Sequence, residues 1–305
     1  MNKINKIKTI VVTGGRGFIG SHFVEECLKV GHEIIDIDKM TYAANLTLPW
    51  DDHPRYTLIR NDIKDLDHLP YCDVVVNFAA ESHVDNSIKS SKIFIDSNVL
   101  GTHNLLELVR GKPDYERPLF FQISTDEVYG DIVKGMFDET DRLSPSNPYS
   151  ATKVAAEMLV KSYHRTYGVD YIITRTANNY GERQYHEKLI PKCIARLKSD
   201  KKIPIHGDGS YIRDWTYVKD NVDALMFLIE KDFKNDIFNI AAENFMTNLD
   251  VARTIMSWAG KEDEEECLKF VENRWGQDVR YAVDSSKIRK LGWKPKFESG
   301  LHKWF

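Results

Sequence analysis

The stretch VVTGGRGFIGS at residues 11–21 constrains the fold more than any other part of the 305-residue chain. It runs from a β-branched segment into a turn with Gly14, Gly17 and Gly20, and then into apolar residues at helical spacing. A G-x-x-G-x-x-G turn lets the backbone approach a pyrophosphate, and the unpaired N–H groups that open the following helix favour that anion. The unit therefore predicts a dinucleotide-binding start to an α/β fold.

Strand and helix patterns alternate along the first part of the chain. Apolar runs predict strands at 7–13, 32–38, 56–59, 73–78, 118–124 and 170–174. Helical spacing follows the glycine turn and recurs at 87–110 and 148–167. This alternation predicts a Rossmann-type doubly wound parallel sheet with helices on both faces. After residue 178 the regularity fades, and helices at 219–231 and 247–260 are expected within a smaller, interleaved C-terminal portion.

Charge and cysteine usage narrow the class of protein. A net charge of -4 against 42 basic residues provides no basic field for nucleic acid or an anionic membrane. No run approaches the roughly 18 apolar residues of a membrane span, and a cytoplasmic location is expected. The four cysteines are widely spaced, without a C-x-x-C pair, which predicts reduced packing residues and no metal site: Cys27, Cys72, Cys193 and Cys267.

An acidic residue follows the second predicted strand. Asp38 lies about 20 residues after the glycine turn, where a carboxylate binds both ribose hydroxyls of adenosine and its charge disfavours a 2′-phosphate. The expected cofactor is therefore NAD. Asp62, after the third strand, is a candidate adenine contact, and its alternative role is a helix cap.

The segment YSATK places Tyr149 and Lys153 four residues apart, on one face of a predicted helix. A phenol titrates near 10, and a lysine ammonium together with an oxidised nicotinamide ring would lower that pKa toward neutrality. Such a tyrosine can take the proton of a sugar hydroxyl while the ring takes the hydride. The alternative is a chance surface pair.

Together these residues resemble the extended short-chain dehydrogenase/reductase superfamily, and the resemblance runs from residue 7 to the end of the chain. It sharpens at STDEVYG, residues 124–130, where the adjacent Asp126 and Glu127 resemble the nucleotide-sugar 4,6-dehydratases. A dehydration needs one carboxyl to take a proton and another to protonate the leaving hydroxyl. Adjacent residues of a strand point to opposite faces, so both can serve one site only if the strand ends there.

The resemblance implies a reaction in three steps. Sugar C4 is oxidised by NAD while Tyr149 takes the 4-hydroxyl proton and Thr125 hydrogen-bonds the same oxygen. Glu127 then removes the C5 proton, and protonated Asp126 releases the C6 hydroxyl as water. Return of the hydride to C6 gives a 4-keto-6-deoxy sugar and regenerates NAD in each turnover. Lys153 completes the implied catalytic set.

The same resemblance implies which residues bind the two ligands. The expected cofactor residues are Gly14, Gly17, Phe18, Ile19, Gly20, Asp38, Lys39, Asp62, Ile63, Ala79, Ala80, Ser82, Tyr149 and Lys153. The expected substrate residues are His83, Asn179, Lys188, His206, Arg213 and Arg274. The two arginines suit a diphosphate because a planar guanidinium binds two oxygens at once. His186 stands where the family usually has proline, so the shape of its loop is left open.

The segments PIHGDG (204–209) and ENRWGQD (272–278) are more similar in sequence to those of UDP-glucose 4,6-dehydratases than to those of bacterial dTDP-glucose enzymes. The expected reaction is therefore conversion of UDP-glucose to UDP-4-keto-6-deoxyglucose, the first step of deoxysugar or rhamnose synthesis. Alternatives are the same reaction on dTDP-glucose, a UDP-glucuronate decarboxylase, a nucleotide-sugar 4-epimerase, and an NAD-sensing regulator. The decarboxylases typically have serine in place of Asp126, the epimerases lack the acidic pair, and the regulators tend to lose the tyrosine or lysine.

The resemblance also implies domains and a partner. Residues 1–177 are expected to form the NAD-binding domain, with 214–240 returning to it, and 178–305 mainly the nucleotide-sugar-binding portion. The predicted helices at 98–110 and 148–167 carry apolar residues on more than one side, whereas a helix covered only by its own sheet needs one stripe. Members of the family pair these helices, so a homodimer with a four-helix interface is expected.

Overall fold

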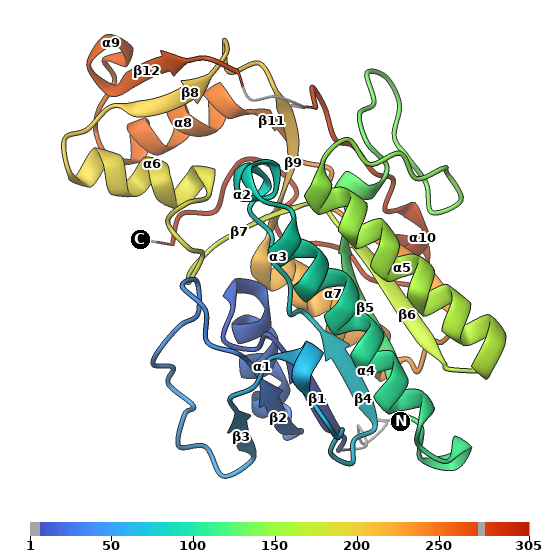
Figure 1. Cartoon of the computed structure of the whole chain (residues 1–305). Helices are drawn as coiled ribbons and strands as arrows, with labels where there is room; N and C mark the ends of the chain where they lie inside the picture. The colour runs from blue at the N-terminus through green and yellow to red at the C-terminus, as the bar shows by residue number, and fades with distance from the viewer. Residues whose placement is uncertain (1–6, 274–277, 305) are drawn as a thin grey trace.

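A seven-stranded parallel sheet forms the centre of the larger layer of the protein (Figure 1). The computed structural model describes residues 7–273 and 278–304. The strand order is β10-β6-β5-β4-β1-β2-β3, so the order reverses between β1 and β4, as in a doubly wound sheet. The strands are β1 (Thr9–Thr13), β2 (Glu33–Ile37), β3 (Tyr56–Ile59), β4 (Val74–Asn77), β5 (Leu119–Thr125), β6 (Tyr171–Thr176) and β10 (Asp236–Ile240). The predicted fold class is confirmed.

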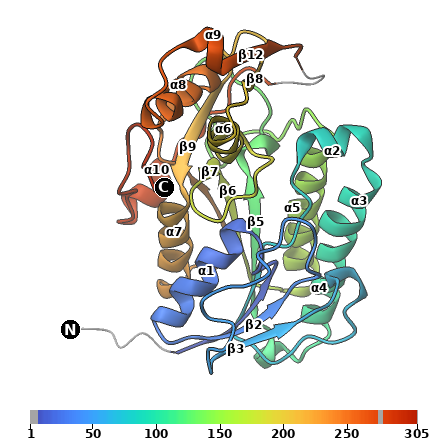
Figure 2. The same cartoon turned by 90° about the vertical axis from the view of Figure 1, so that its left-hand side faces the viewer.

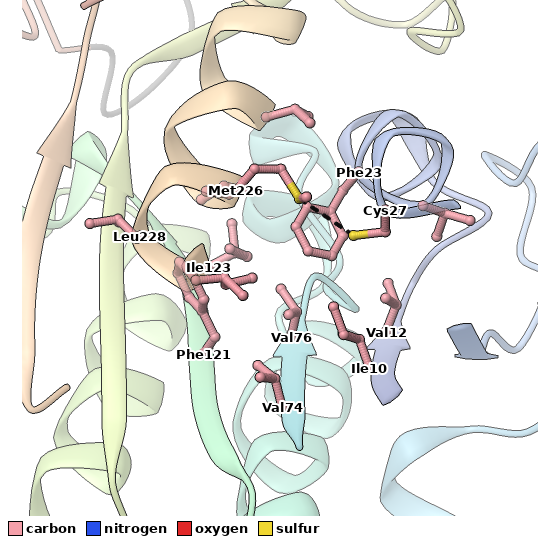
Figure 3. Close-up of a cluster of buried hydrophobic side chains, with 14 of the residues drawn as sticks. Ile10, Val12, Phe23, Cys27, Val74, Val76, Phe121, Ile123, Met226 and Leu228 are labelled. Atoms are coloured by element: carbon pink, nitrogen blue, oxygen red, sulfur yellow. Dashed lines mark hydrogen bonds between the residues drawn. The ribbon is translucent and has the colours of Figure 1, made fainter. Parts of the chain in front are cut away.

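Helices cover both faces of this sheet because its strands are apolar on both sides (Figure 2). Ile10 and Val12 of β1 pack beneath α1 (Phe18–Lys29) and α7 (Val218–Glu230). Val11 points the other way and packs beneath α4 (Gly101–Arg110) and α5 (Pro148–Tyr167). Figure 3 shows the first of these clusters, in which the Cys27 thiol lies 3.5 Å from the Met226 sulfur. All four cysteines are buried, which confirms the prediction that they are packing residues.

The smaller portion lies above the carboxyl ends of the strands (Figure 1). It contains a three-stranded sheet of β7 (Asn178–Tyr180), β9 (Ile212–Tyr217) and β11 (Phe245–Thr247), and a parallel pair of β8 (Ile203–His206) and β12 (Leu268–Val271). Its helices are α6 (Leu189–Lys198), α8 (Asn248–Trp258) and α9 (Glu264–Cys267), and α10 (Ser286–Lys290) contacts β10. The chain between β9 and β11 leaves this portion to build α7 and β10 of the large layer.

The helical pattern predicted over 87–110 is confirmed, but it is divided into several segments. The structure has α2 (Val84–Lys89), an extended residue at Ser90, α3 (Lys92–Phe94), a π-helical segment (Ile95–Leu100) and then α4. Serine side chains compete for backbone hydrogen bonds and favour helix ends, which explains the interruption at Ser90 and Ser91. None of the helices among the described residues combines the length and the apolar character needed to cross a membrane.

Candidate active site

The glycine turn leaves a hollow at the carboxyl edge of the sheet, directly after β1. Gly14 has φ +71°, and a Cβ there would lie 2.8 Å from the Ala79 backbone. A Cβ at Gly20 would lie 2.3 Å from the Gly14 carbonyl oxygen, so only glycine lets α1 begin this close to the turn. Gly17 is the N-cap residue of α1 and faces the same hollow. These are the features that a bound pyrophosphate requires.

One continuous pocket runs from the glycine turn past β2 and β4 to the end of β5. It is lined by all the residues predicted to bind the cofactor: Gly14, Gly17, Phe18, Ile19, Gly20, Asp38, Lys39, Asp62, Ile63, Ala79, Ala80, Ser82, Tyr149 and Lys153. The Asp38 carboxylate is fixed in it, because Oδ2 accepts from the Arg16 N–H at 3.0 Å and Oδ1 from the Met40 N–H at 2.7 Å. The pocket thus has the shape and polar groups that a dinucleotide with an unphosphorylated ribose needs.

Asp62 has two roles in the structure. Its Oδ1 accepts from the Lys64 N–H at 3.1 Å and caps a short 3₁₀ turn, Ile63–Asp65. Its Oδ2 lies 3.6 Å from the Lys39 ammonium, which also donates to the Ser97 hydroxyl at 3.0 Å. The cap and the pocket position therefore coexist at this residue.

The acidic pair lies where β5 stops, and the expectation that the strand ends here is confirmed. Thr125 is the last strand residue, and residues 126–128 form a 3₁₀ turn whose Glu127 N–H donates to the Thr125 hydroxyl oxygen at 3.3 Å. Because the strand is interrupted between them, Asp126 and Glu127 both line the same pocket.

The surroundings of the two carboxyls differ. Burial raises the pKa of Asp126 well above its usual range, and the charges of Glu127 and Asp214 add to the shift. Its Oδ2 has no hydrogen-bond partner among the described residues. Burial also raises the pKa of Glu127, but a hydrogen bond from the Asn147 amide at 3.3 Å and the Arg213 charge oppose the rise. This asymmetry favours a protonated Asp126 beside an ionised Glu127.

Tyr149 and Lys153 lie on the first turns of α5, whose N-terminus is closed by a capping box of Asn147 and Ser150. Both side chains are buried, and the Lys153 ammonium donates to the Ile123 carbonyl at 2.6 Å. Burial lowers the Lys153 pKa to about 8, against the opposing charge of Glu157.

The protein groups alone shift the pKa of Tyr149 upward. Burial raises it far above its usual range, and the charges of Glu127 and Asp126 add to the rise, opposed by a hydrogen bond with Thr125. The Lys153 ammonium is directed to the Ile123 backbone carbonyl. The predicted lowering of the tyrosine pKa invoked Lys153 together with the oxidised nicotinamide ring, so it stays a prediction for the cofactor-bound protein.

The predicted substrate residues line a second hollow that continues from the first. His83, Asn179, Lys188, His206 and Arg213 all border it, and Ser82, Glu127, Asn178, Asn179, Gln184, Glu187 and Lys188 border both hollows. The Lys188 ammonium donates to the Ser82 carbonyl at 2.9 Å. Arg274 lies outside the described residues.

Several polar atoms of this second hollow point to a ligand. Nδ1 of His83 and Oδ1 of Asn179 are buried without hydrogen-bond partners among the described residues. The Arg213 guanidinium stacks over the Tyr281 ring at 4.2 Å and donates to the Asp278 carbonyl at 2.9 Å. Nδ1 of His206 lies 2.9 Å from the Glu272 carbonyl oxygen at the edge of the hollow. Buried polar atoms without partners are rare, so a polar ligand is the simplest complement.

The sequence patterns missed part of the lining. Thr41, Ala43 and Ala44 come from the long connection between β2 and β3, which has no periodic pattern. Four further lining residues lie close in sequence to predicted residues such as Ala80 and Lys188: Glu81, Gln184, Tyr185 and Glu187. Tyr281 follows the ENRWGQD segment, and nothing in the sequence alone marks its position beside Arg213.

Comparisons with known proteins show the family of the chain. The family model described as GDP-mannose 4,6 dehydratase matches residues 11–303. A low-salt glycan biosynthesis protein of Haloferax volcanii is 44% identical, over 96% of each chain. A dTDP-glucose 4,6-dehydratase of Neisseria gonorrhoeae is 43% identical, over 97% of this chain and 94% of the relative.

A plant relative and a solved structure extend these matches. A trifunctional UDP-glucose 4,6-dehydratase/UDP-4-keto-6-deoxy-D-glucose 3,5-epimerase/UDP-4-keto-L-rhamnose-reductase of Arabidopsis thaliana is 39% identical, over 98% of this chain and 46% of that protein. The crystal structure of a dTDP-glucose 4,6-dehydratase from Streptomyces venezuelae, solved with NAD bound, superposes with a TM-score of 0.89 at 37% identity. That match covers 94% of this chain and 92% of the other.

Proposed function

This chain belongs to the GDP-mannose 4,6-dehydratase family, and on that premise we propose that it is an NAD-dependent 4,6-dehydratase of a nucleoside diphosphate glucose, with UDP-glucose as the preferred substrate. The observation that carries the proposal is the pair Asp126 and Glu127. The two carboxyls end one strand, line the pocket of Tyr149 and Lys153, and differ in the forces on their protons. A dehydration needs one acid and one base, and this pair supplies both.

The cofactor fits the pocket described above. Gly14, Gly17 and Gly20 would hold its pyrophosphate, Asp38 its adenosine ribose, and Lys153 the ribose next to the nicotinamide. Bound NAD supplies a hydride acceptor at the start of the reaction and a hydride donor at its end.

The residues of the chain then divide the proton transfers. Thr125 and Tyr149 hold the sugar 4-hydroxyl, and Tyr149 accepts its proton. Glu127, anionic beside the Asn147 amide, removes the proton from C5, which the neighbouring ketone has made acidic. Asp126 is buried and protonated, and it donates to the C6 hydroxyl as that group leaves as water. Burial of Asp126 keeps it protonated at a pH where an exposed carboxyl would be ionised.

The choice of UDP-glucose over dTDP-glucose rests on the sequences of two motifs. PIHGDG and ENRWGQD resemble the UDP-glucose enzymes, and the Arabidopsis relative carries that activity in its name. The Neisseria relative, which names dTDP-glucose, is slightly more similar overall, so dTDP-glucose is the alternative substrate. Neither decarboxylation nor 4-epimerisation releases a hydroxyl as water, so neither reaction would use the protonated carboxyl of Asp126.

We also propose the division of the chain and its assembly. Residues 1–177, with 214–240, would bind NAD, and the rest of 178–305 would mainly bind the nucleotide sugar. The broken helix over 84–110 and α5 would pair with their copies in a homodimer. Exposed apolar side chains on these helices support that assembly, among them Ile93, Leu100 and Met158.

The test is mass spectrometry of UDP-glucose and dTDP-glucose, incubated separately with the purified protein without added reductant. We expect loss of one water from UDP-glucose and a slower loss from dTDP-glucose, and neither loss with the Asp126→Asn variant. A faster loss from dTDP-glucose would support the same reaction but make dTDP-glucose the preferred substrate. An unchanged mass for both sugars, with NAD bound to the protein, would contradict the dehydratase proposal.

A further inference from the structure

Residues 40–53, here called the strap, connect β2 to β3 without any helix or strand. Figure 1 shows this segment as the blue loop at the lower left, rising toward the yellow loop that follows β7. Connections of this length without secondary structure are uncommon in compact domains and are usually functional. Thr41, Ala43 and Ala44 of the strap border the cofactor pocket on the side of Asp38.

An arginine inside the glycine turn holds the strap. Arg16 stands between Gly14 and Gly17, is only 2% exposed, and forms an ion pair with Asp51 near the far end of the strap. Its Nε donates to the Asn45 carbonyl at 2.9 Å and its Nη2 to the Leu46 carbonyl at 2.7 Å. The Arg16 carbonyl in turn accepts from the Asn45 N–H at 2.8 Å and from its side-chain amide at 2.9 Å.

The turn that would hold the pyrophosphate and the strap beside the ribose are therefore one hydrogen-bonded unit. The Arg16 N–H adds the link to Asp38 itself, at 3.0 Å. A buried guanidinium of this kind cannot release the strap without losing a charged partner, and such a loss is costly. The unit does not need to open during turnover, because the proposed reaction returns its hydride to the same sugar.

The other side of the strap contacts the loop that borders the substrate hollow. The Tyr42 ring lies edge-on to Tyr185 with centroids 5.3 Å apart. The Arg183 guanidinium lies over the Trp50 ring at 5.1 Å and donates to Glu25 of α1. The strap is thus attached to the glycine turn on one side and to residues 183–185 on the other.

We propose that the strap, fastened by Arg16 and Asp51, retains the cofactor by closing the adenosine end of its pocket, so that NAD stays bound between turnovers. This inference rests on the proposed function for the identity of the cofactor. Arg16 and Asp51 act through the strap and the glycine turn, and they are positioning residues.

The test measures how fast NADH leaves the protein. The purified protein is loaded with NADH, mixed with excess NAD⁺, and the loss of bound-nucleotide fluorescence is followed. We expect Arg16→Ala to raise the dissociation rate at least about tenfold, the size expected when charge-assisted hydrogen bonds are lost. Asp51→Asn should act in the same direction. The control is Arg253→Ala on α8, which removes an exposed ion pair with Glu264 of α9 and should leave the rate unchanged.

A third variant guards against loss of folding, because Arg16 is buried. Tyr42→Leu removes an exposed ring from the strap without touching the core, and we expect it to raise the rate several-fold. If Asp51→Asn and Tyr42→Leu release NADH as slowly as the native protein, the strap does not retain the cofactor and the proposal is overturned. A native protein that binds no NADH would instead contradict the proposed function.

Discussion

Lys153 is an active-site residue whose pKa the fold lowers. Burial lowers its pKa from 10.5 to about 8, although Glu157 lies four residues further along α5 and opposes the shift. Burial therefore destabilises the charged form of this side chain, whose ammonium lies beside the Ile123 carbonyl. A buried lysine with a lowered pKa is typical of functional sites.

The same shift predicts how stability depends on pH. Between pH values of about 8 and 10.5 an unfolded chain still protonates this lysine, whereas the folded chain has released the proton. The unfolded state then binds more protons, so the free energy of unfolding rises with pH across this window. We expect this group to contribute up to about 3 kcal/mol of that rise in the cofactor-free protein.

Urea unfolding at a series of pH values, compared with a Lys153→Met variant, measures this contribution. The difference between the two proteins should grow as the pH rises toward 10.5 and stay constant below about 8. Lys161→Met, an exposed lysine on the same helix, should follow the native curve. Parallel curves for the native protein and Lys153→Met would show that the lysine is not shifted.

Asp126 and Glu127 predict two distinct losses of activity. Asp126→Asn keeps the shape of the side chain but cannot donate a proton, and Glu127→Gln cannot accept one. We expect each variant to form the dehydrated product about 10²–10⁴-fold more slowly, with the affinity for the sugar nucleotide little changed. Only Asp126→Asn should still exchange the C5 hydrogen with deuterated solvent, because its base remains.

Mass spectrometry of the product and of the recovered substrate in deuterated solvent measures both effects. The matched control is Asp131→Asn, an exposed carboxylate five residues beyond Asp126. Equal rates for the native protein and Asp126→Asn would remove this residue from the mechanism.

At the scale of elements, Asn147 at the start of α5 both caps the helix and contacts the proposed catalytic base. The Asn147 side chain accepts from the Ser150 N–H at 3.0 Å as the helix cap, while its amide donates to Glu127 at 3.3 Å. Asn147→Ala should therefore lower the free energy of unfolding by about 1 kcal/mol and also slow the elimination step. Thr247→Ala removes a comparable cap from α8 and should cost similar stability without changing the rate.

Denaturant unfolding and product formation, measured on both variants, separate the two roles. If Asn147→Ala and Thr247→Ala lower stability equally and leave the rate equally unchanged, Asn147 is a cap and nothing more.

Elements with strong local signals were predictable from the sequence. The strand over 56–59 and the helix over 148–167 have the predicted bounds, because apolar runs and a proline at the first helical position mark them locally. The helical pattern over 87–110 is present, but the break at Ser90 and Ser91 was not predicted, because the apolar spacing continues across it. The short strands β7, β8, β11 and β12 form through pairing with distant segments, which no local pattern encodes.

The candidate site was predictable where a motif names its own residues, as at the glycine turn and at Tyr149. It was not predictable where the environment decides the outcome. The direction of the Tyr149 pKa shift depends on burial and on two carboxylates from the turn after β5, and the strap is held to the glycine turn by a buried arginine. Such features depend on tertiary contacts between distant segments, and they emerge only from the folded arrangement.

At the scale of the whole molecule, one side remains unusually apolar. The helices between 84 and 110 and α5 lie together on the same side of the large sheet, as Figure 2 shows. Their large apolar side chains that are more than two-fifths exposed are Ile88, Ile93, Ile95, Leu100, Met158 and Tyr167. Clustered apolar exposure on a globular chain marks an interaction site, and a homodimer is the partner that we propose for it.

The dimer predicts how charge on this side would change assembly. Met158→Arg and Leu100→Arg would each place a charge against its symmetry-related surface, because a two-fold interface presents the same patch from both chains. We expect each to weaken dimerisation by about 2 kcal/mol or more, enough to produce monomers at micromolar concentration while the circular dichroism stays native. Val133→Arg, an equally drastic change at an exposed site in the connection before α5, is the control and should leave the dimer intact. Sedimentation velocity distinguishes the two species directly, and a native protein that sediments as a monomer at these concentrations would refute the dimer.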